Sequence, residues 1–259
     1  MSVLGSIIAG VLEDQALRQV SNSELEERMA RAAKPLDVLA TLSKEKFSII
    51  AEVKRSSPSK GSLAQIPAPE RLARQYQDGG AAVISVLTER RCFGGSLEDF
   101  SKVRKEVSIP MLRKDFIVNE YLVRESRAHG ADLILLIVAA LSDSQLSELY
   151  QLVTTLGMQA LIEIHNQEEL DRALEISPKI IGVNARNLKT LEIDKGNFQI
   201  LLPMIPAGVY RIAESGMSGP KDALEALIAG ADAILIGEAL VKSDDPADSV
   251  RQFLNVAKP

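Results

Sequence analysis

The chain has 259 residues and a mass of 28.1 kDa, and its 30 lysines and arginines against 35 acidic residues give a net charge of −5. A hydrophobic content of 46% is ordinary for a globular protein and excludes a disordered chain. The acidic balance argues against a general nucleic-acid binder, because neutralising phosphates requires an excess of basic residues.

Cysteine and histidine are scarce. A single cysteine, Cys92, excludes an intramolecular disulfide framework and any multi-cysteine metal site, and two histidines leave little for a zinc site. The expected compartment is therefore the reducing cytoplasm. The longest apolar run, residues 133–141, is shorter than the ~20 residues that a bilayer-spanning helix needs. We expect no metal and no membrane association.

The first 47 residues are predicted to form a helical extension that caps the mouth of the barrel predicted below for the rest of the chain. No basic residue precedes its apolar stretch, so the stretch does not resemble a secretory signal. The apolar positions instead follow the spacing of one helix face: Leu4, Ile7, Ile8, Val11 and Leu12. Residues 48–259 are predicted to be a single domain, because no linker-like segment interrupts them.

From residue 48, short β-rich apolar runs alternate with longer amphipathic stretches. The runs begin roughly 22 to 34 residues apart, the size of one strand–helix unit. The runs cover residues 48–54, 82–87, 109–114, 133–138, 159–164, 179–184, 209–214 and 231–236. Helices are expected at 70–77, 97–106, 121–128, 142–156, 168–174, 220–229 and 246–256.

Eight such units predict an α/β fold of the (β/α)₈ TIM-barrel class. A doubly wound sheet is the alternative, but the sequence lacks the glycine-rich phosphate-binding motifs typical of that fold. Three of the runs open with Gly-Ala-Asp or Gly-Ala-Ala, at residues 80–82, 130–132 and 230–232. The glycine ends the preceding helix by adopting a left-handed φ, so the repeat supports the division into units.

Polar residues end several of the predicted strands. In a barrel of this class the active site lies at the carboxyl ends of the strands. Glu52 and Lys54 share one face because side chains alternate along a strand, and Lys114, Glu163, Asn184 and Glu214 end later runs. A charge within an apolar strand is costly unless it is paired. These positions predict a polar ring at one mouth, although any single one could be a structural salt bridge.

Two late loops predict a phosphate site. The segments at 214–219 and 236–240 follow the last two strands and contain glycine or serine, whose backbone N–H groups can face an anion. Phosphate commonly binds at this place in TIM barrels, although ordinary turns would look alike. The loop at 54–61 carries three cations and could also hold an anion, or it could be a basic surface loop.

Several motifs carry a resemblance to one family. They are IIAEVKRSSPS at 49–59, LRKDFI at 112–117, LIEI at 161–164, IGVNARNL at 181–188 and AESG at 213–216. In their order and spacing they resemble the indole-3-glycerol-phosphate synthase family, in a monofunctional form that catalyses one step of tryptophan biosynthesis. The resemblance implies conversion of a small phosphorylated substrate, 1-(2-carboxyphenylamino)-1-deoxyribulose 5-phosphate, to indole-3-glycerol phosphate, carbon dioxide and water. It implies no cofactor, no metal and no obligate protein partner.

The resemblance also implies roles for individual residues. Lys114 matches the general acid and Glu163 a carboxylate that assists proton transfer. Lys54 matches the residue that meets the substrate carboxylate, and Glu52 matches its partner. Asn184 and Glu214 match two further catalytic positions. The implied substrate-binding residues are Ser57, Phe93, Phe116, Arg186, Leu188, Ser215, Gly216, Gly237 and Glu238.

Glu238 departs from a family pattern in which serine can follow this glycine. Its carboxylate would repel a phosphate, so we expect only its backbone N–H to contact one. His129 is expected to cap a helix end. His165 lies near the mouth, but no catalytic role is expected for it, nor for Cys92.

Two alternative functions remain at this point. One is another phosphate-binding TIM barrel, an isomerase or epimerase, which would need no lysine facing a glutamate. The other is a non-catalytic barrel that acts as a scaffold. The sequence leaves open the oligomeric state, the rate-limiting step and any channelling partner.

Overall fold

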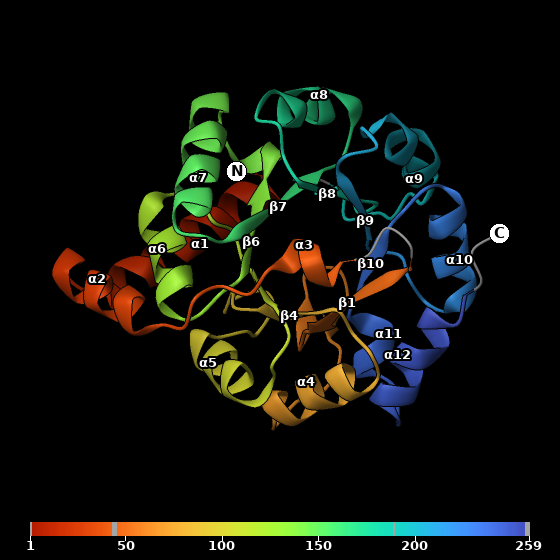
Figure 1. The fold of residues 1–259 in the computed structure, drawn as a ribbon, viewed down its shortest axis with the longest axis horizontal. Helices are drawn as coiled ribbons and strands as arrows, with labels where there is room; N and C mark the ends of the chain where they lie inside the picture. The colour runs from red at the N-terminus through yellow and green to blue at the C-terminus, as the bar shows by residue number, and fades with distance from the viewer. Residues whose placement is uncertain (1, 43–45, 189, 257–259) are drawn as a thin grey trace.

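A computed structural model describes residues 2–42, 46–188 and 190–256. The remaining parts of the predicted ranges 1–47 and 48–259 lie outside the described residues. Eight parallel strands form a closed barrel (Figure 1), in which β10 pairs with β1 through Ser48 and Ala233. The predicted TIM barrel is confirmed, and the alternative of an open doubly wound sheet is wrong. The barrel strands are β1 Ser48–Val53, β4 Val83–Leu87, β5 Met111–Lys114, β6 Leu133–Ile137, β7 Gln159–Ile164, β8 Ile180–Asn184, β9 Tyr210–Glu214 and β10 Ala233–Ile236.

Helices surround the barrel and connect its strands. They are α4 Pro69–Asp78, α5 Leu97–Glu106, α6 Glu120–Ala128, α7 Asp143–Thr155, α8 Gln167–Glu175, α9 Gly196–Leu201, α10 Pro220–Ile228 and α12 Pro246–Leu254. The predicted helices are confirmed with end shifts of one or two residues. Elements too short to show a periodicity were missed: α9, α11 Glu238–Val241, the 3₁₀ turns Val138–Ala140 and Leu202–Met204, and a hairpin of β2 Ser56–Ser57 with β3 Gly61–Ser62.

The Gly-Ala-Ala and Gly-Ala-Asp segments join α4, α6 and α10 to the strands that follow them, and the two with aspartate also hydrogen-bond to the neighbouring strand. Gly80, Gly130 and Gly230 have φ values of 101°, 83° and 104°, as predicted for a left-handed helix end. The aspartate then accepts a hydrogen bond from a backbone N–H at the start of the neighbouring strand. Asp132 Oδ2 accepts from Met111 at 2.7 Å, and Asp232 Oδ2 accepts from Arg211 at 2.9 Å. The motif therefore fixes where neighbouring strands begin relative to each other.

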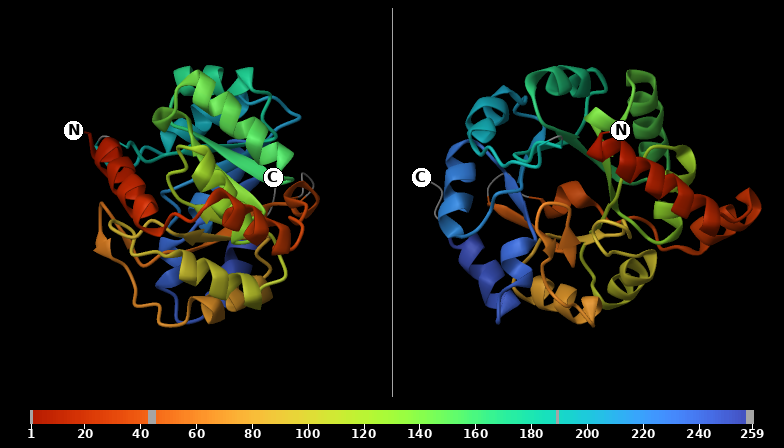
Figure 2. Two further views of the ribbon diagram at one scale, coloured as in Figure 1. Left: turned by 90° about the vertical axis from the view of Figure 1, so that its left-hand side faces the viewer. Right: turned by 180° about the vertical axis from the view of Figure 1, so that it is seen from behind.

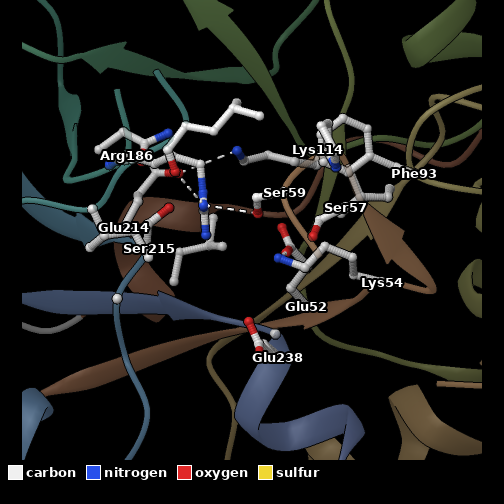
Figure 3. Close-up of a pocket in the computed structure, with 18 of the residues that line it drawn as sticks. Glu52, Lys54, Ser57, Ser59, Phe93, Lys114, Arg186, Glu214, Ser215 and Glu238 are labelled. Carbon is white, nitrogen blue, oxygen red and sulfur yellow. Dashed lines mark hydrogen bonds and ion pairs between the residues drawn. The ribbon is translucent and has the colours of Figure 1, made fainter. Parts of the chain in front are cut away.

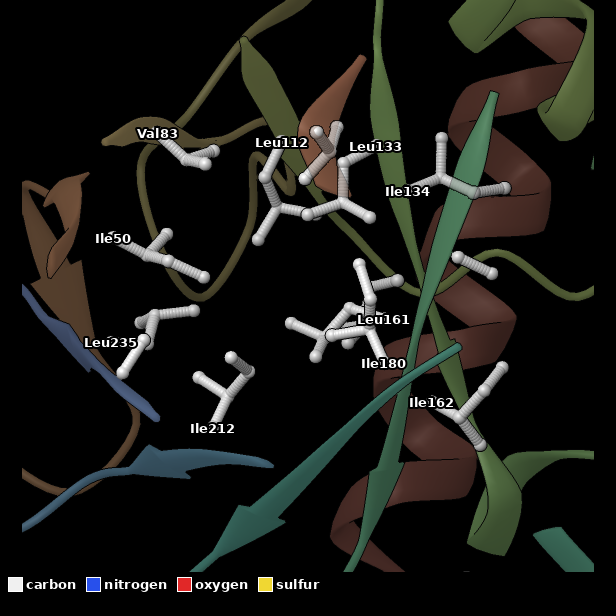
Figure 4. Close-up of a cluster of buried hydrophobic side chains, with 14 of the residues drawn as sticks. Ile50, Val83, Leu112, Leu133, Ile134, Leu161, Ile162, Ile180, Ile212 and Leu235 are labelled. Carbon is white, nitrogen blue, oxygen red and sulfur yellow. The ribbon is translucent and has the colours of Figure 1, made fainter. Parts of the chain in front are cut away.

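Apolar side chains fill the barrel interior below its polar mouth. Ile50, Leu112, Leu161, Ile212 and Leu235 are 0–5% exposed, and Figure 4 shows them gathered between the strands. Side chains alternate along a strand, so the residue two positions further on points to the same interior. Those next interior positions are Glu52, Lys114, Glu163, Glu214 and Gly237. The packing of the core thereby aims the polar residues into the mouth.

The N-terminal extension runs from one end of the barrel to the other. It contains α1 Val3–Arg18, α2 Asn22–Arg31 and α3 Val38–Thr41. Figure 2 shows α1 across the end of the barrel that faces away in Figure 1, and α2 packs beside α6. At the opposite end, Tyr210 at the start of β9 donates hydrogen bonds to the carbonyls of Leu39 and Leu42.

The apolar face of α1 differs in part from the predicted one. Ile7 and Val11 are buried, whereas Leu12 is 40% exposed, because the helix contacts the barrel along a narrower stripe than its apolar spacing suggests. Among the helices of the described residues, none combines the length and the apolar character that a membrane span requires. The capping role of residues 1–47 stays a prediction.

Asp132 should be a major contributor to stability. Its carboxylate is 2% exposed and accepts from the backbone of Leu36 and Met111 and from Arg104 at 2.7–2.8 Å. Asp132→Ala leaves three donors without an acceptor, so the free energy of unfolding should fall by about 2–4 kcal/mol, measured by urea denaturation. Glu24→Ala removes an exposed pair with Arg28 and is the control, with a much smaller expected change. Equal effects of the two variants would contradict this.

Candidate active site

A cavity of about 580 Å³ lies at the carboxyl ends of the barrel strands. Every residue predicted for the site lines it, and the structure therefore brings together side chains from all parts of the chain. Figure 3 shows Glu52, Lys54 and Ser57 on one side of the cavity and Arg186, Glu214 and Ser215 across from them. The roles assigned to these residues are not decided by this placement and are taken up below.

Lys114 is the central cation of the cavity. It ends β5, and its Nζ lies 3.1 Å from Glu163 Oε2 on β7 and 3.3 Å from Glu214 Oε2 on β9. Both glutamate side chains are 2% exposed. One ammonium group therefore compensates two buried carboxyl groups that would otherwise be very costly.

The buried cluster shifts the protonation of all three groups. Burial alone would lower the pKa of Lys114, but the carboxylates of Glu163, Glu214 and Glu52 outweigh it and hold that pKa above its ordinary value. Burial alone would raise the pKa of Glu163, but Lys114 and His165 outweigh it and hold that pKa below its usual range. Burial and the charge of Glu163 together raise the pKa of Glu214. Lys114 is therefore protonated at neutral pH, and Glu163 is ionised.

A second ion pair lies beside the first. Lys54 Nζ is 2.8 Å from Glu52 Oε1, and Ser85 Oγ lies 3.4 Å from the other oxygen of Glu52. The Glu52 side chain is 3% exposed, whereas that of Lys54 is 20% exposed and reaches the cavity. Glu52 thus holds the cation in place from below and leaves its outer side open to a ligand.

Asn184 and Arg186 connect β8 to two loops. Asn184 Oδ1 accepts from the backbone N–H of Arg186 at 2.9 Å, and the Asn184 amide hydrogen-bonds to Glu163. The Arg186 guanidinium donates to Ser59 Oγ at 3.0 Å and to the Leu191 carbonyl at 2.9 Å. Arg186 therefore links the loop after β1 to the loop after β8 at the cavity rim.

The loops after β9 and β10 form the predicted anion end of the cavity. Ser215 and Gly216 both have left-handed backbones, with φ values of 70° and 76°. This conformation is uncommon for serine, and such strain is often retained where backbone groups face a ligand. Gly237 lies so close to Glu52 that a Cβ at residue 237 would be 2.8 Å from Glu52 Oε1. Only glycine fits here without moving that carboxylate.

Glu238 is paired in a way that the sequence analysis missed. Its Oε1 accepts from Lys60 at 2.7 Å and from Lys242 at 2.8 Å, and these two lysines also line the cavity. The repulsion expected between this carboxylate and a phosphate is therefore offset by two cations. The i,i+4 spacing of Glu238 and Lys242 was visible in the sequence, whereas Lys60 lies 178 positions away from Glu238.

Apolar side chains form the remaining wall. Phe93 and Phe116 lie with their ring centroids 6.2 Å apart, and Leu188 also lines the cavity. Three residues of α1 that were not predicted for the site line it as well: Val3, Leu4 and Ile7. The sequence predicted that the apolar face of α1 covers the barrel mouth, but it did not identify these three residues as part of the cavity wall.

The two histidines differ in their surroundings. His129 is the C-cap residue of α6, at the helix end where it was expected. Burial lowers its pKa, so the cation expected at this helix end is not supported. His165 was not expected to take part in the site, yet its Nε2 lies 3.4 Å from Glu163 Oε1. Cys92 is half-buried after β4 and does not line the cavity.

Comparison with known proteins decides the family. A family model described as "Indole-3-glycerol phosphate synthase" matches residues 6–253. A protein of that name from Mycobacterium sp. (strain KMS) is 57% identical over 255 residues, covering 98% of this chain and 94% of that protein. Another, from Saccharopolyspora erythraea, is 54% identical over 256 residues, covering 98% and 95%. The chain belongs to the indole-3-glycerol phosphate synthase family. Family membership excludes the isomerase, epimerase and scaffold alternatives.

Solved structures of more distant proteins share the fold of this synthase. A 3-hexulose-6-phosphate synthase superimposes with a TM-score of 0.66 at 15% identity, covering 81% of this chain and 99% of that one. A thiamine phosphate pyrophosphorylase from Pyrococcus furiosus gives 0.63 at 13% identity, covering 82% and 96%. At these identities the likeness concerns the barrel alone.

Gly182 should be essential for the geometry of the synthase site. It lies on β8 where a Cβ would overlap Oε1 of Glu214. Gly182→Ala should displace that carboxyl group from Lys114 and lower kcat by about tenfold to a hundredfold, measured from indole absorbance. Gly208→Ala is the matched control, because a Cβ there would meet nothing within 4 Å. Wild-type kcat in Gly182→Ala would mean that the position of Glu214 does not matter.

Proposed function

We propose that Lys114 is the general acid of the synthase reaction and that the surrounding residues hold the substrate against it. In this reaction the aromatic carbon that bears the carboxylate attacks the ketose carbonyl, and the amine nitrogen attached to the aromatic ring supplies the electrons. Carbon dioxide then leaves, which restores the aromatic ring, and loss of the hydroxyl group as water gives the indole. The steps require positioning and proton transfers. Because the amine nitrogen of the substrate supplies the electrons, the proposed reaction needs no organic cofactor and no metal.

The placement of Lys114 between Glu163 and Glu214 is the observation that carries the proposal. Ring closure turns the carbonyl oxygen into an alkoxide, which needs a proton and a nearby positive charge. Lys114 supplies both, because its ammonium group is held protonated and lies in the cavity at the end of β5. The interactions with the two glutamates fix the ammonium in place before the substrate arrives.

Glu163 is proposed to assist the later proton transfers of the dehydration. It is ionised, lies 3.1 Å from Lys114 and can accept a proton that Lys114 or the substrate releases. Glu214 shares Lys114 with it, and Asn184 orients Glu163 through a hydrogen bond. These residues form one connected group across four strands.

Lys54 is proposed to bind the substrate carboxylate. Its ammonium is held by Glu52 and faces the cavity, so a second carboxylate can approach from the open side. Phe93, Phe116 and Leu188 provide the apolar wall for the aromatic ring. Arg186 and Ser57, from the loops after β8 and β1, complete this side of the cavity.

The substrate phosphate is proposed to bind between the loops after β9 and β10. The backbones of Ser215, Gly216, Gly237 and Glu238 line that end of the cavity, and a phosphate there would also face Lys60 and Lys242. Both lysines are 50% exposed and already pair with Glu238. Inorganic phosphate is therefore expected to compete with the substrate.

We also propose that the enzyme acts in the cytoplasm and without an obligate protein partner. All the residues predicted for the site line one cavity of this chain. The single cysteine, Cys92, leaves nothing for an intramolecular disulfide.

Lys114→Met should be the most damaging substitution for turnover. Methionine keeps most of the stem volume and removes the charge and the protons. Because the acid and the alkoxide stabilisation are lost together, kcat should fall by at least ~10³-fold, as measured by indole formation together with carbon dioxide release. Lys54→Met should affect KM proportionally more than Lys114→Met does, because the substrate carboxylate that Lys54 is proposed to bind is already present in the ground state.

The surface variant Lys102→Met is the control, since Lys102 pairs only with Glu98 on the outer face of α5 among the described residues. If Lys114→Met retains a tenth or more of wild-type kcat, the general acid is another residue, and Lys54 is the first candidate.

The extension formed by residues 1–47 is proposed to cap the cavity through α1. Leu4 and Ile7 line the cavity, and Arg18 ties α1 to Glu125 of α6 at 2.8 Å. The helix therefore lies where it can cover a bound substrate and exclude water.

The double substitution of Leu4 and Ile7 by glutamine should raise KM about tenfold, because two apolar side chains of the cavity wall become polar. Leu17→Gln on the same helix is the control, since Leu17 is 86% exposed. Steady-state kinetics should show an unchanged KM for the control. An unchanged KM in the double variant would rule out the cap.

A further inference from the structure

A histidine lies directly behind the catalytic carboxylate and is unused by the mechanism above. His165 follows β7, and its side chain is only 10% exposed. Its Nδ1 lies 2.9 Å from Glu169 Oε2, and its Nε2 lies 3.4 Å from Glu163 Oε1. The ring thus stands between two carboxylates, one at the start of α8 and one in the active site.

Glu169 is held rigidly at the start of α8. Its Oε2 accepts from the backbone N–H of His165 at 2.8 Å, and its Oε1 accepts from Asn166 Nδ2 at 2.9 Å. Its own backbone N–H donates to Asn166 Oδ1 at 2.9 Å. The helix cap therefore fixes Glu169, and Glu169 fixes the plane of the imidazole.

These contacts determine where the protons of His165 lie. An ionised carboxylate only accepts hydrogen bonds, so Nδ1 carries a hydrogen toward Glu169. Nε2 is buried and faces the ionised Glu163, whose Oε1 at 3.4 Å is farther away than in an ordinary hydrogen bond. A bare lone pair there would face a negative oxygen. The favourable state has a hydrogen on both nitrogens, which makes the ring a cation.

Resting on the role of Glu163 proposed above, we propose that His165 is a positioning residue whose imidazolium holds the Glu163 carboxylate for turnover. Glu163 is then bound at both oxygens, Oε2 by Lys114 of β5 and Oε1 by His165. The charged groups alternate from Glu169 through His165 and Glu163 to Lys114. The remaining groups facing Glu163 are Asn184 of β8 and Glu214 of β9.

This arrangement predicts an unusual pH dependence. Burial alone would lower the pKa of His165, but Glu163 and Glu169 outweigh it and raise that pKa to about 9. The cation therefore persists below pH 9 and is lost as the pH rises through that value. Turnover should fall over the same range, whereas Lys114, whose pKa is raised above its ordinary value, should keep its proton there.

Histidine titration by NMR tests the imidazolium without using activity. The chain has two histidines, so the His129→Gln variant leaves one imidazole signal. That signal should titrate near pH 9, and it should titrate at lower pH when Glu163→Gln is added. Titration at or below the ordinary value of about 6.5 would overturn the proposal.

Kinetics test the positioning role. His165→Asn keeps a donor near Glu169 but cannot reach Glu163, so kcat should fall about tenfold with little change in KM. The acidic limb of the pH profile should also move to higher pH. His165→Gln can place an amide N–H near the position of Nε2 and should recover most of kcat, without the alkaline fall near pH 9. Melting curves check that both variants are folded.

Glu163→Gln separates the two proposals. A loss of kcat in Glu163→Gln together with wild-type kcat and pH profile in His165→Asn overturns the role of His165 alone. Wild-type kcat in Glu163→Gln overturns the proposed role of Glu163, and with it the reason for positioning that carboxylate. If His165→Asn lowers kcat by a larger factor in the wild-type enzyme than in the Glu163→Gln variant, His165 acts through Glu163.

Discussion

The ammonium of Lys114 is the group on which the polar mouth of the barrel depends. Two glutamate side chains that are almost completely buried face it, and the ionised carboxylate of Glu163 would be very costly at this depth without a cation. The same interactions keep the lysine protonated and fixed. The charge that stabilises the buried, ionised Glu163 is also the charge that a developing alkoxide would require.

The barrel holds this cluster rigidly because its polar residues lie on strands rather than on loops. Glu52, Lys114, Glu163 and Glu214 each follow a fully packed apolar residue two positions earlier, as Lys114 follows Leu112 and Glu163 follows Leu161. A small displacement of a catalytic group costs much activity, and a close-packed interior resists such displacement. The loops after β1, β8, β9 and β10 instead carry residues that are proposed to bind the ends of the substrate.

Much of this arrangement could be predicted from the sequence, because it depends on local rules. Continuous apolar runs identify the strands, and their polar final residues identify the mouth, so Lys114, Glu163 and Glu214 could be selected from spacing and from the family motifs. The alternation of side chains along each strand also identifies the face of the strand that points into the barrel. The Gly-Ala-Asp repeat was recognised for its glycine, whereas the role of its aspartate appears only when the neighbouring strand is in place.

The residues that were missed depend on contacts between distant parts of the chain. Lys60 meets Glu238 across the barrel, and Val3 and Leu4 reach the cavity from the opposite end of the sequence. The sequence placed His165 near the barrel mouth. Its proposed role, however, depends on the orientation of its ring, which the cap of α8 determines. Sequence periodicity contains no information on such an orientation.

The most direct test of the central claim is to remove the amine of Lys114 and then restore it chemically. In a Cys92→Ser background, Lys114→Cys should be folded and nearly inactive. Alkylation with 2-bromoethylamine replaces the lysine by a thioether analogue with the amine at the same reach, and turnover should return. An alkylated enzyme that binds substrate but stays inactive would contradict the account, as would full activity before alkylation.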